Sequence, residues 1–205
     1  NTTRTVEAQQ ATVRVPPSVG VLGALSFNDS VAFPWFAPAG FARGALNAES
    51  TAVSLNNTNL DDLNGKDINP IIAFPGSSGP VIFGQRTLQA AASALDRINV
   101  RRLFLTIEGT IERAARSQLF EFNDDLTRTN FLNIVEPYLR DVKAKRGITD
   151  FVVICDESNN TPAVIDSNTF KADIFVKPAR SINFIGLTFV ATRTGISFDE
   201  VVGSV

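Results

Sequence analysis

The sequence predicts an α+β fold of the α/β sandwich-like type, in which a mixed sheet is packed by two long helices. Two observations support this prediction. Apolar residues recur at steps of three and four over residues 99–119 and 129–145, which is typical of amphipathic helices. Three strand-like apolar runs follow, at residues 151–155, 170–177 and 182–192. The second half of the chain therefore orders as helix, helix, strand, strand, strand.

Proline and glycine interrupt the first 95 residues heavily, so only short elements are expected there. The apolar run 15–27 opens with two prolines, which suits a helix that begins just after them. Residues 56–69 are rich in Asn, Asp and Gly, and they predict turns around one short helix. Short strands are expected at residues 71–74 and 81–83, because proline and glycine bound both runs.

The two long helices carry distinct local signals. The apolar stripe of residues 99–119 has charged residues largely on its other side. In the second helix, Pro137 lacks an N–H group and should introduce a kink. Gly147 should end this helix, since it follows a basic last turn that suits the negative helix end.

The three strands differ in how they should be covered. Residues 151–155 are continuously apolar, as expected for a central strand that is covered on both faces. Residues 170–177 alternate between apolar and charged side chains, which predicts one buried and one exposed face. Residues 182–192 form a long run that is apolar on both faces.

The composition of the 205-residue chain excludes several function classes. There is no histidine, so catalysis by a Ser-His-Asp triad and zinc sites ligated by histidine are both excluded. The single cysteine, Cys155, lies in an apolar run and is expected to be a buried, inert thiol. A net charge of −2 argues against a general nucleic-acid binder. The longest uncharged run, 68–85, contains three prolines and three glycines, so no membrane-spanning helix is expected.

Two patterns are similar to ligand-binding loops but lack the residues that such loops need. Gly79 and Gly84 have the spacing of a phosphate loop, yet Gln85 and Arg86 stand where lysine and a hydroxyl residue are required. An α/β nucleotide-binding enzyme therefore stays as an alternative that the sequence does not favour. Residues 61–67 have the composition of a calcium loop without its alternation or its bidentate glutamate. Capping of turns by these side chains is the favoured interpretation.

Two acidic pairs have simple structural explanations. Asp124 and Asp125 precede the second long helix, where they complement the helix dipole. Asp156 and Glu157 follow a buried strand, as solvated acids at its end. These patterns give no enzymatic assignment and no cofactor, so the residues alone indicate an interaction or assembly module.

An ordered set of short segments resembles the signatures of contractile tail sheath proteins of tailed bacteriophages of the myovirus type. The segments are residues 16–18, 37–44, 69–71, 84–88, 98–103, 120–124, 150–156, 159–162, 174–179 and 189–195. The resemblance covers about residues 15–203 and is similar to the C-terminal, inner domain of a sheath subunit. It is specific because the segments follow one another in the family's order.

The resemblance implies a structural subunit that polymerises with copies of itself as stacked hexameric rings around a tail tube. Contraction of the rings would drive the tube through the host envelope for genome delivery. The implied partners are the tail tube protein and the baseplate and tail terminator proteins, with no nucleic acid, membrane, cofactor or enzymatic activity. The implied location is the virion tail, assembled in the host cytoplasm. The sheath of a related contractile device, a bacteriocin or a secretion apparatus, is the alternative.

The resemblance also implies domain boundaries and contact residues. Residues 15–205 would form the sheath core domain, with 189–205 either a C-terminal arm exchanged with a neighbour or a segment folded back on its own domain. Residues 1–14 would be a remnant of a preceding domain or a linker, and the absence of an initiator methionine predicts missing N-terminal domains. The candidate contacts with other subunits or the tube are Arg101, Arg102, Lys143, Lys145, Arg146, Phe189 and Arg193. The alternatives are a structural ion pair for the first two and a solvated helix end for the three that follow.

Overall fold

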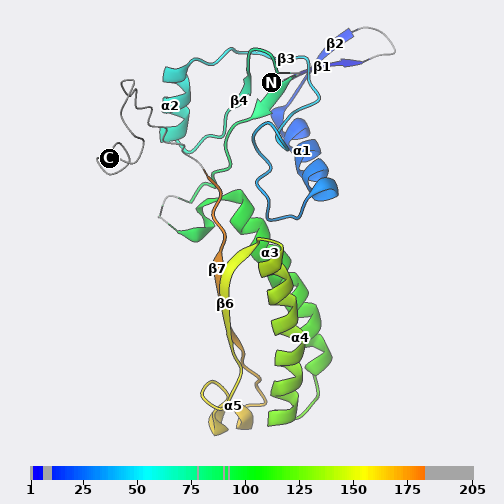
Figure 1. Cartoon of the computed structure of the whole chain (residues 1–205), viewed down its shortest axis with the longest axis vertical. Coiled ribbons are helices and arrows are strands. Elements are labelled where there is room, and N and C mark those ends of the chain that lie inside the picture. The colour runs from blue at the N-terminus through cyan, green and yellow to red at the C-terminus, as the bar shows by residue number, and fades with distance from the viewer. Residues whose placement is uncertain (1, 7–10, 78, 90, 92, 183–205) are drawn as a thin grey trace, which may run out of the picture.

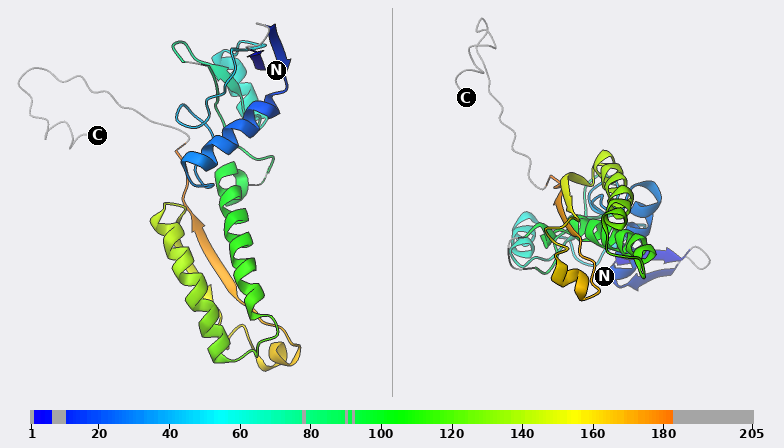
Figure 2. Two further views of the ribbon diagram at one scale, coloured as in Figure 1. Left: turned by 90° about the vertical axis from the view of Figure 1, so that its right-hand side faces the viewer. Right: turned by 90° about the horizontal axis from the view of Figure 1, so that it is seen from below.

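Two units follow one another along the long axis of the computed structural model (Figure 1). The loop unit, residues 2–97, combines short helices and strands with long connections. The helical unit, residues 98–178, contains two long helices beside a pair of strands (Figure 2). The structure describes residues 2–6, 11–77, 79–89, 91 and 93–182.

The loop unit begins with a β-hairpin and a helix. Strands β1 (Thr2–Val6) and β2 (Ala11–Val15) pair antiparallel, and β3 (Ser50–Thr51) adds to the other side of β1. These strands include most of residues 1–14, whose assignment as a remnant or linker stays a prediction. Helix α1 (Pro17–Val31) begins with proline at its first position, where the missing N–H group costs no hydrogen bond.

The rest of the loop unit contains the short elements that the sequence predicts. Helix α2 (Asn57–Gly65) starts at a capping box, in which Asn56 and Asn59 each accept from the other's backbone N–H group. Strands β4 (Ile71–Ala73) and β5 (Pro80–Ile82) pair antiparallel, and the 3-10 helix η1 spans Ala94–Asp96.

The helical unit has two long helices packed on one face of a two-stranded sheet (Figure 2). Its elements are α3 (Ile98–Ala115), the 3-10 helix η2 (Arg116–Gln118), α4 (Asp125–Ala144), β6 (Ile148–Ile154), α5 (Pro162–Asp166) and β7 (Asp173–Pro178). Strands β6 and β7 pair antiparallel.

The main core lies between α3, α4 and this sheet. Phe131, Val135, Leu139 and Val142 lie on one face of α4 because they recur at helical spacing, and all four are buried. The buried members of the core are Trp35, Leu103, Ile107, Phe131, Val135, Leu139, Val142, Ile148 and Cys155. Trp35 is the one buried member that comes from the loop unit, so the core spans the junction between the two units.

The α+β class and the two long helices are confirmed, whereas the sheet differs from the expectation of one mixed sheet. The described strands form three small sheets in which every pair is antiparallel. The strand predicted at 151–155 is covered on one face only, because Val152 is 54% exposed on the side away from the helices. In the strand predicted at 182–192, only residue 182 lies within the described part of the chain.

Helix α4 contains Pro137, as the sequence analysis expected, and the kink at this residue stays a prediction. Pro137 is exposed, so the carbonyl group that it leaves unpaired can bond water.

The C-terminus of α4 differs in detail from the prediction. The left-handed residue there is Arg146, with φ +63°, instead of Gly147. The N–H groups of Arg146 and Gly147 donate to the carbonyl groups of Lys143 and Val142, which is a Schellman motif. Gly147 is needed for space, since a Cβ atom there would lie 2.7 Å from Cγ1 of Val142.

Candidate functional site

Five of the seven candidate contact residues come together at the junction between the two units, here called the waist. Arg101 and Arg102 lie near the start of α3, and Lys143, Lys145 and Arg146 lie at the end of α4. The two helices are antiparallel neighbours, so the start of one lies beside the end of the other (Figure 2). Phe189 and Arg193 lie outside the described residues.

Arg102 makes an ion pair within the chain. Its Nη2 atom lies 2.5 Å and 2.6 Å from the two carboxylate oxygens of Asp29, near the end of α1. The Arg102 side chain is only 18% exposed, and its Nη1 atom is buried without a hydrogen-bond partner among the described residues. The ion pair therefore joins α1 to α3 within the chain, and a contact of Arg102 with another subunit stays a prediction.

The two lysines of the waist are held by acids close to them. Nζ of Lys143 lies 3.1 Å from Asp150, and this hydrogen bond lowers the pKa of the Asp150 carboxyl group. Nζ of Lys145 lies 2.6 Å from Asp141, one helical turn earlier, and 5.1 Å from the ring centre of Phe33. Both ion pairs are largely exposed and therefore contribute little to stability.

Arg101 and Arg146 differ from the other three basic residues of the waist. Both are exposed, and neither makes a side-chain hydrogen bond or ion pair with any described part of the chain. These two cations are consequently available for a partner molecule.

Sequence reasoning missed Trp35, which connects the waist to the loop unit. Its indole N–H group donates to the carbonyl oxygen of Lys145 at 3.0 Å, and its ring stacks on Phe33 with centroids 5.0 Å apart. The side-chain amide of Asn99 donates in turn to the carbonyl group of Trp35. The one signal in the sequence was a single tryptophan in a proline-rich segment that fits neither a helix nor a strand.

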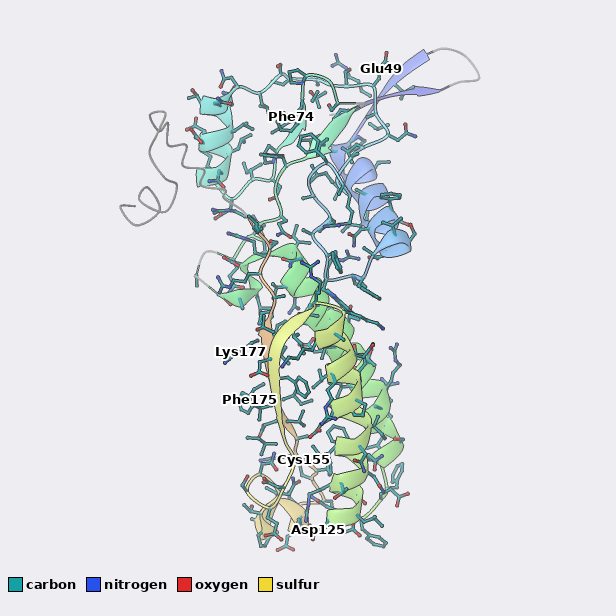
Figure 3. All side chains as sticks on the ribbon, in the orientation of Figure 1. Glu49, Phe74, Asp125, Cys155, Phe175 and Lys177 are labelled. Atoms are coloured by element: carbon teal, nitrogen blue, oxygen red, sulfur yellow. The ribbon has the colours of Figure 1, made fainter. Side chains whose placement is uncertain are left out.

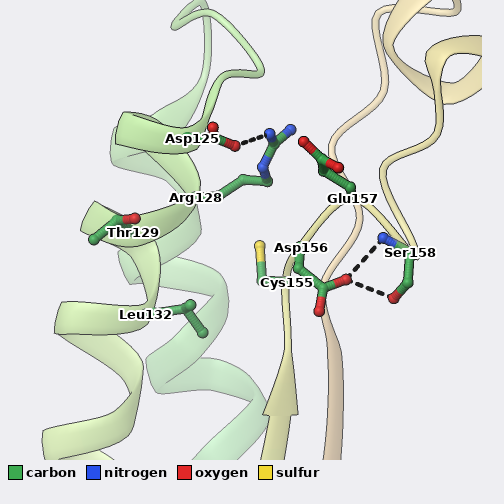
Figure 4. A pocket seen from close by; sticks show the side chains of 8 residues that line it. All are labelled: Asp125, Arg128, Thr129, Leu132, Cys155, Asp156, Glu157 and Ser158. Carbon is green, nitrogen blue, oxygen red and sulfur yellow. Dashed lines mark hydrogen bonds and ion pairs between the residues drawn. The ribbon is translucent and has the colours of Figure 1, made fainter.

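A second candidate region is a hollow of about 560 Å³ between the start of α4 and the end of β6 (Figure 4). Arg128 is buried in its wall, where it pairs with Asp125 and donates to the side-chain oxygen of Asn123 at 3.0 Å. Cys155 is buried beside it, as predicted, and burial raises the pKa of its thiol. A protonated thiol is a poor nucleophile, so this hollow does not resemble a catalytic site.

The acids around this hollow have the structural roles that the sequence predicts. The carboxylate of Asp124 caps α4 by accepting from the N–H group of Thr127 at 2.8 Å, and this bond lowers the pKa of Asp124. The hydroxyl and the N–H group of Ser158 donate to Asp156, which lowers its pKa as well. Within the described ranges, no group of three or more acidic, cysteine or histidine side chains is placed to hold a metal ion.

The segment with the composition of a calcium loop and the segment with the spacing of a phosphate loop lie close to each other in the structure. The side-chain amide of Asn69 donates to the carbonyl group of Arg86 at 2.8 Å and accepts from its N–H group at 2.7 Å. Asp67, from the calcium-like cluster, forms an ion pair with the Arg86 side chain at 2.5 Å. Gly84 packs so closely on Asn69 that a Cβ atom would lie 2.7 Å from its Oδ1 atom. In the part of the chain that is described, no helix is long and apolar enough to cross a membrane.

Comparison with known proteins places these features in one family. The model of the phage tail sheath C-terminal domain matches residues 90–192. The chain is 45% identical over 190 residues to the tail sheath protein of Vibrio phage KVP40, covering 92% of this chain and 28% of that protein. It is 42% identical over 190 residues to the tail sheath protein of Enterobacteria phage T4, covering 92% of this chain and 29% of that protein.

Solved structures show the same fold. The helical sheath of the anti-feeding prophage in its contracted state superposes with a TM-score of 0.82 and 26% identity, covering 94% of this chain and 54% of that one. The chain thus spans less than a third of the curated relatives and about half of the solved sheath chain. Because the family model matches half of its residues, the chain belongs to the phage tail sheath C-terminal domain family.

Proposed function

We propose that this chain is the inner domain of a structural subunit that polymerises as stacked hexameric rings around a tail tube and contracts to drive the tube through the host envelope. The observation that carries the proposal is its identity of 45% and 42% to two phage tail sheath proteins over 92% of its length. Its likeness to a sheath in the contracted state supports the contractile part. The phage relatives support a place in a virion tail, and the proposal adds genome delivery and assembly in the host cytoplasm.

The surface of the described residues supports a role in an assembly. Large apolar side chains are exposed on both units, including Leu22 on α1 and Phe120 and Phe122 between α3 and α4. Patches of this kind mark protein–protein contacts more often than free surface. In the described part of the chain, β6 and β7 bond only to each other, so strands from neighbouring copies could extend this sheet.

The proposed role is mechanical and not enzymatic, and it requires no cofactor. The chain has no histidine to act as a general base, and the thiol of Cys155 is buried with a raised pKa. The phosphate-loop spacing at residues 79–84 is taken up by strand β5. Such a subunit would move as a rigid body and switch between two alternative packings against its neighbours.

The proposed partners are other copies of the chain, the tail tube protein, the baseplate and the tail terminator. Among the candidate contacts, Arg101 and Arg146 fit this role best because their charges are not neutralised within the described residues. Arg102, Lys143 and Lys145 are engaged within the chain. We retain 15–205 as the core domain in the proposal, with 189–205 either a C-terminal arm exchanged with a neighbour or a segment folded back on its own domain.

The sheath of a related contractile injection device is the second candidate, because a contracted anti-feeding prophage sheath shares the fold. Identity to that sheath is 26%, against 45% for the KVP40 protein, so the phage tail is favoured. Both candidates share the same assembly and contraction, and they differ in whether a genome follows the tube.

Electron microscopy of the full-length subunit tests the proposal. We expect tubules of stacked six-fold rings when the subunit is produced with its tube protein. A matched sample without the tube shows whether the tube templates the extended state. Monomers under every condition, with and without the tube, would overturn the proposal.

A further inference from the structure

The far end of the helical unit, here called the tip, consists of the connection between α3 and α4, residues 119–126, and the facing loop, residues 156–158. The connection carries an exposed apolar patch. The side chain of Phe120 is fully exposed and that of Phe122 is 84% exposed, while Leu119 and Leu126 are exposed beside them. Figure 3 shows the tip at the foot of the molecule, where Asp125 is labelled.

The backbone holds one of these rings outward. Phe120 has φ +73°, in the left-handed region that bulky side chains rarely adopt. The exposed ring gains no contact inside the chain that would offset this strain. Strain of this kind at an exposed aromatic residue is typical of a recognition surface.

Acidic side chains surround the apolar patch. The exposed carboxylates at this end are Glu121, Asp124, Asp125, Asp156, Glu157, Asp166 and Asp173. Arg128 is buried against Asp125 and Arg116 pairs with Glu112, so Arg113, in the last turn of α3, is the one exposed arginine near this end without an ion pair among the described residues. Lys171 is the exposed lysine of the segment that leads from α5 into β7. A partner of the tip should therefore present apolar side chains together with positive charge.

The waist presents this complementary chemistry. Arg101 and Leu105 lie one turn apart on the same exposed face of α3, and Arg146 is exposed at the end of α4. Helix α3 has 18 residues and is about 27 Å long, so the tip and the waist lie too far apart to meet within one molecule.

We infer that the tip of one copy docks on the waist of a second copy, with Phe120 and Phe122 against Leu105 and with Glu121 facing Arg101. The two surfaces are different, so the contact is heterologous. Repeated from copy to copy, such a contact either closes into a ring or continues as an open helical array. This inference rests on the self-assembly in the proposed function, and it assigns the surfaces that would carry it.

Cysteine cross-linking between two variants tests the contact. One chain carries Phe122→Cys and the other carries Leu105→Cys with a tag that changes its size. The native Cys155 is buried and reacts slowly, so the new thiols dominate under mild oxidation. We expect the mixed disulfide to exceed, several-fold, that formed by a control in which Leu22→Cys replaces Leu105→Cys. Leu22 is also exposed but lies on α1, so equal yields with both partners would overturn the inference.

Charge reversal adds a readout of specificity. Glu121→Lys in the tip chain, or Arg101→Glu in the waist chain, should each lower the cross-link yield several-fold, and the two reversals together should restore it. Both side chains are exposed and make no ion pair within the described residues, so both variants should fold. Equal circular dichroism spectra check this point. Lowered yields without restoration would overturn the pairing of tip and waist.

The same variants in the full-length subunit separate this inference from the proposed function. Tubules that form without any disulfide between the substituted positions 122 and 105 would sink the contact and leave the sheath function standing. A cross-link with no tubules under any condition would support the contact and count against the sheath. A tip thiol that reacts with the tube protein in place of the waist would also overturn the inference.

Discussion

The indole N–H group of Trp35 donates a hydrogen bond to the carbonyl oxygen of Lys145, 3.0 Å away and 110 residues later in the chain. Lys145 is the C-cap of α4, where carbonyl groups lose their partners within the helix. Trp35 is 9% exposed and belongs to the main core. One side chain therefore fills the core and satisfies the end of α4, which joins the loop unit to the helical unit.

Replacement of this tryptophan by phenylalanine should destabilise the chain. Trp35→Phe keeps an aromatic ring but leaves the Lys145 carbonyl group without its donor, at a cost of about 1–3 kcal/mol. Urea unfolding followed by far-UV circular dichroism measures the change. Phe33→Leu is the control, because it removes the stacking on Trp35 and leaves the hydrogen bond. A Trp35→Phe variant as stable as the parent would show that the bond contributes nothing.

Two glycines should respond in opposite directions to alanine. A Cβ atom at position 147 would lie 2.7 Å from Val142, 3.1 Å from Leu103 and 3.1 Å from Trp35, so Gly147→Ala should destabilise by about 1–3 kcal/mol. At Gly109, inside α3, nothing lies within 4 Å of the added atom. Gly109→Ala should therefore stabilise by about 1 kcal/mol through helix propensity. Thermal unfolding of both variants checks the signs, and a stabilised Gly147→Ala variant would contradict the packing described for the waist.

The ion pair between Arg102 and Asp29 should show measurable coupling. A double-mutant cycle with Arg102→Ala and Asp29→Ala should give about 1–2 kcal/mol, since Arg102 is mostly buried and contacts both carboxylate oxygens. The exposed pair Arg116–Glu112 is a matched control and should give at most about 0.5 kcal/mol. Equal coupling energies for the two pairs would mean that burial of Arg102 does not strengthen its ion pair.

The cap of α4 should make the helix sensitive to acid. The N–H group of Thr127 lowers the pKa of Asp124 below its usual value of 3.8. A lowered pKa in the folded state means that the stabilisation is present above the usual value and is lost as the pH falls below it. Asp124→Asn keeps an acceptor for the cap but cannot titrate.

Urea titrations from about pH 6 to about pH 2 measure this effect. The parent should lose more stability over the acid range than Asp124→Asn does. Glu121→Gln, an exposed acid outside the cap, should behave as the parent. Identical pH profiles for the parent and Asp124→Asn would rule out the cap as a source of acid sensitivity.

Local signals predicted the helices well because these signals act over a few residues. The apolar steps of α3 and α4 determine which face is buried, and Asp124 was expected at the start of α4 for its charge. The prolines at positions 16 and 17 set the start of α1. The ends were less predictable: the sequence favoured Gly147 as the left-handed stop, but Arg146 takes that conformation in the Schellman motif and Gly147 is needed for close packing.

The sequence by itself therefore determined the α+β class, the two amphipathic helices, the lack of any chemistry that needs histidine, and the resemblance to contractile sheaths. Only the tertiary structure decided which basic residues at the start of α3 are neutralised: Arg102 pairs with Asp29, whereas Arg101 has no ion pair among the described residues. It also decided that the β6–β7 sheet is open on one face and that Trp35 closes the end of α4. Helix periodicity and caps arise from neighbours along the chain, whereas Arg102 and Asp29 lie 73 residues apart in the sequence and meet only through tertiary packing.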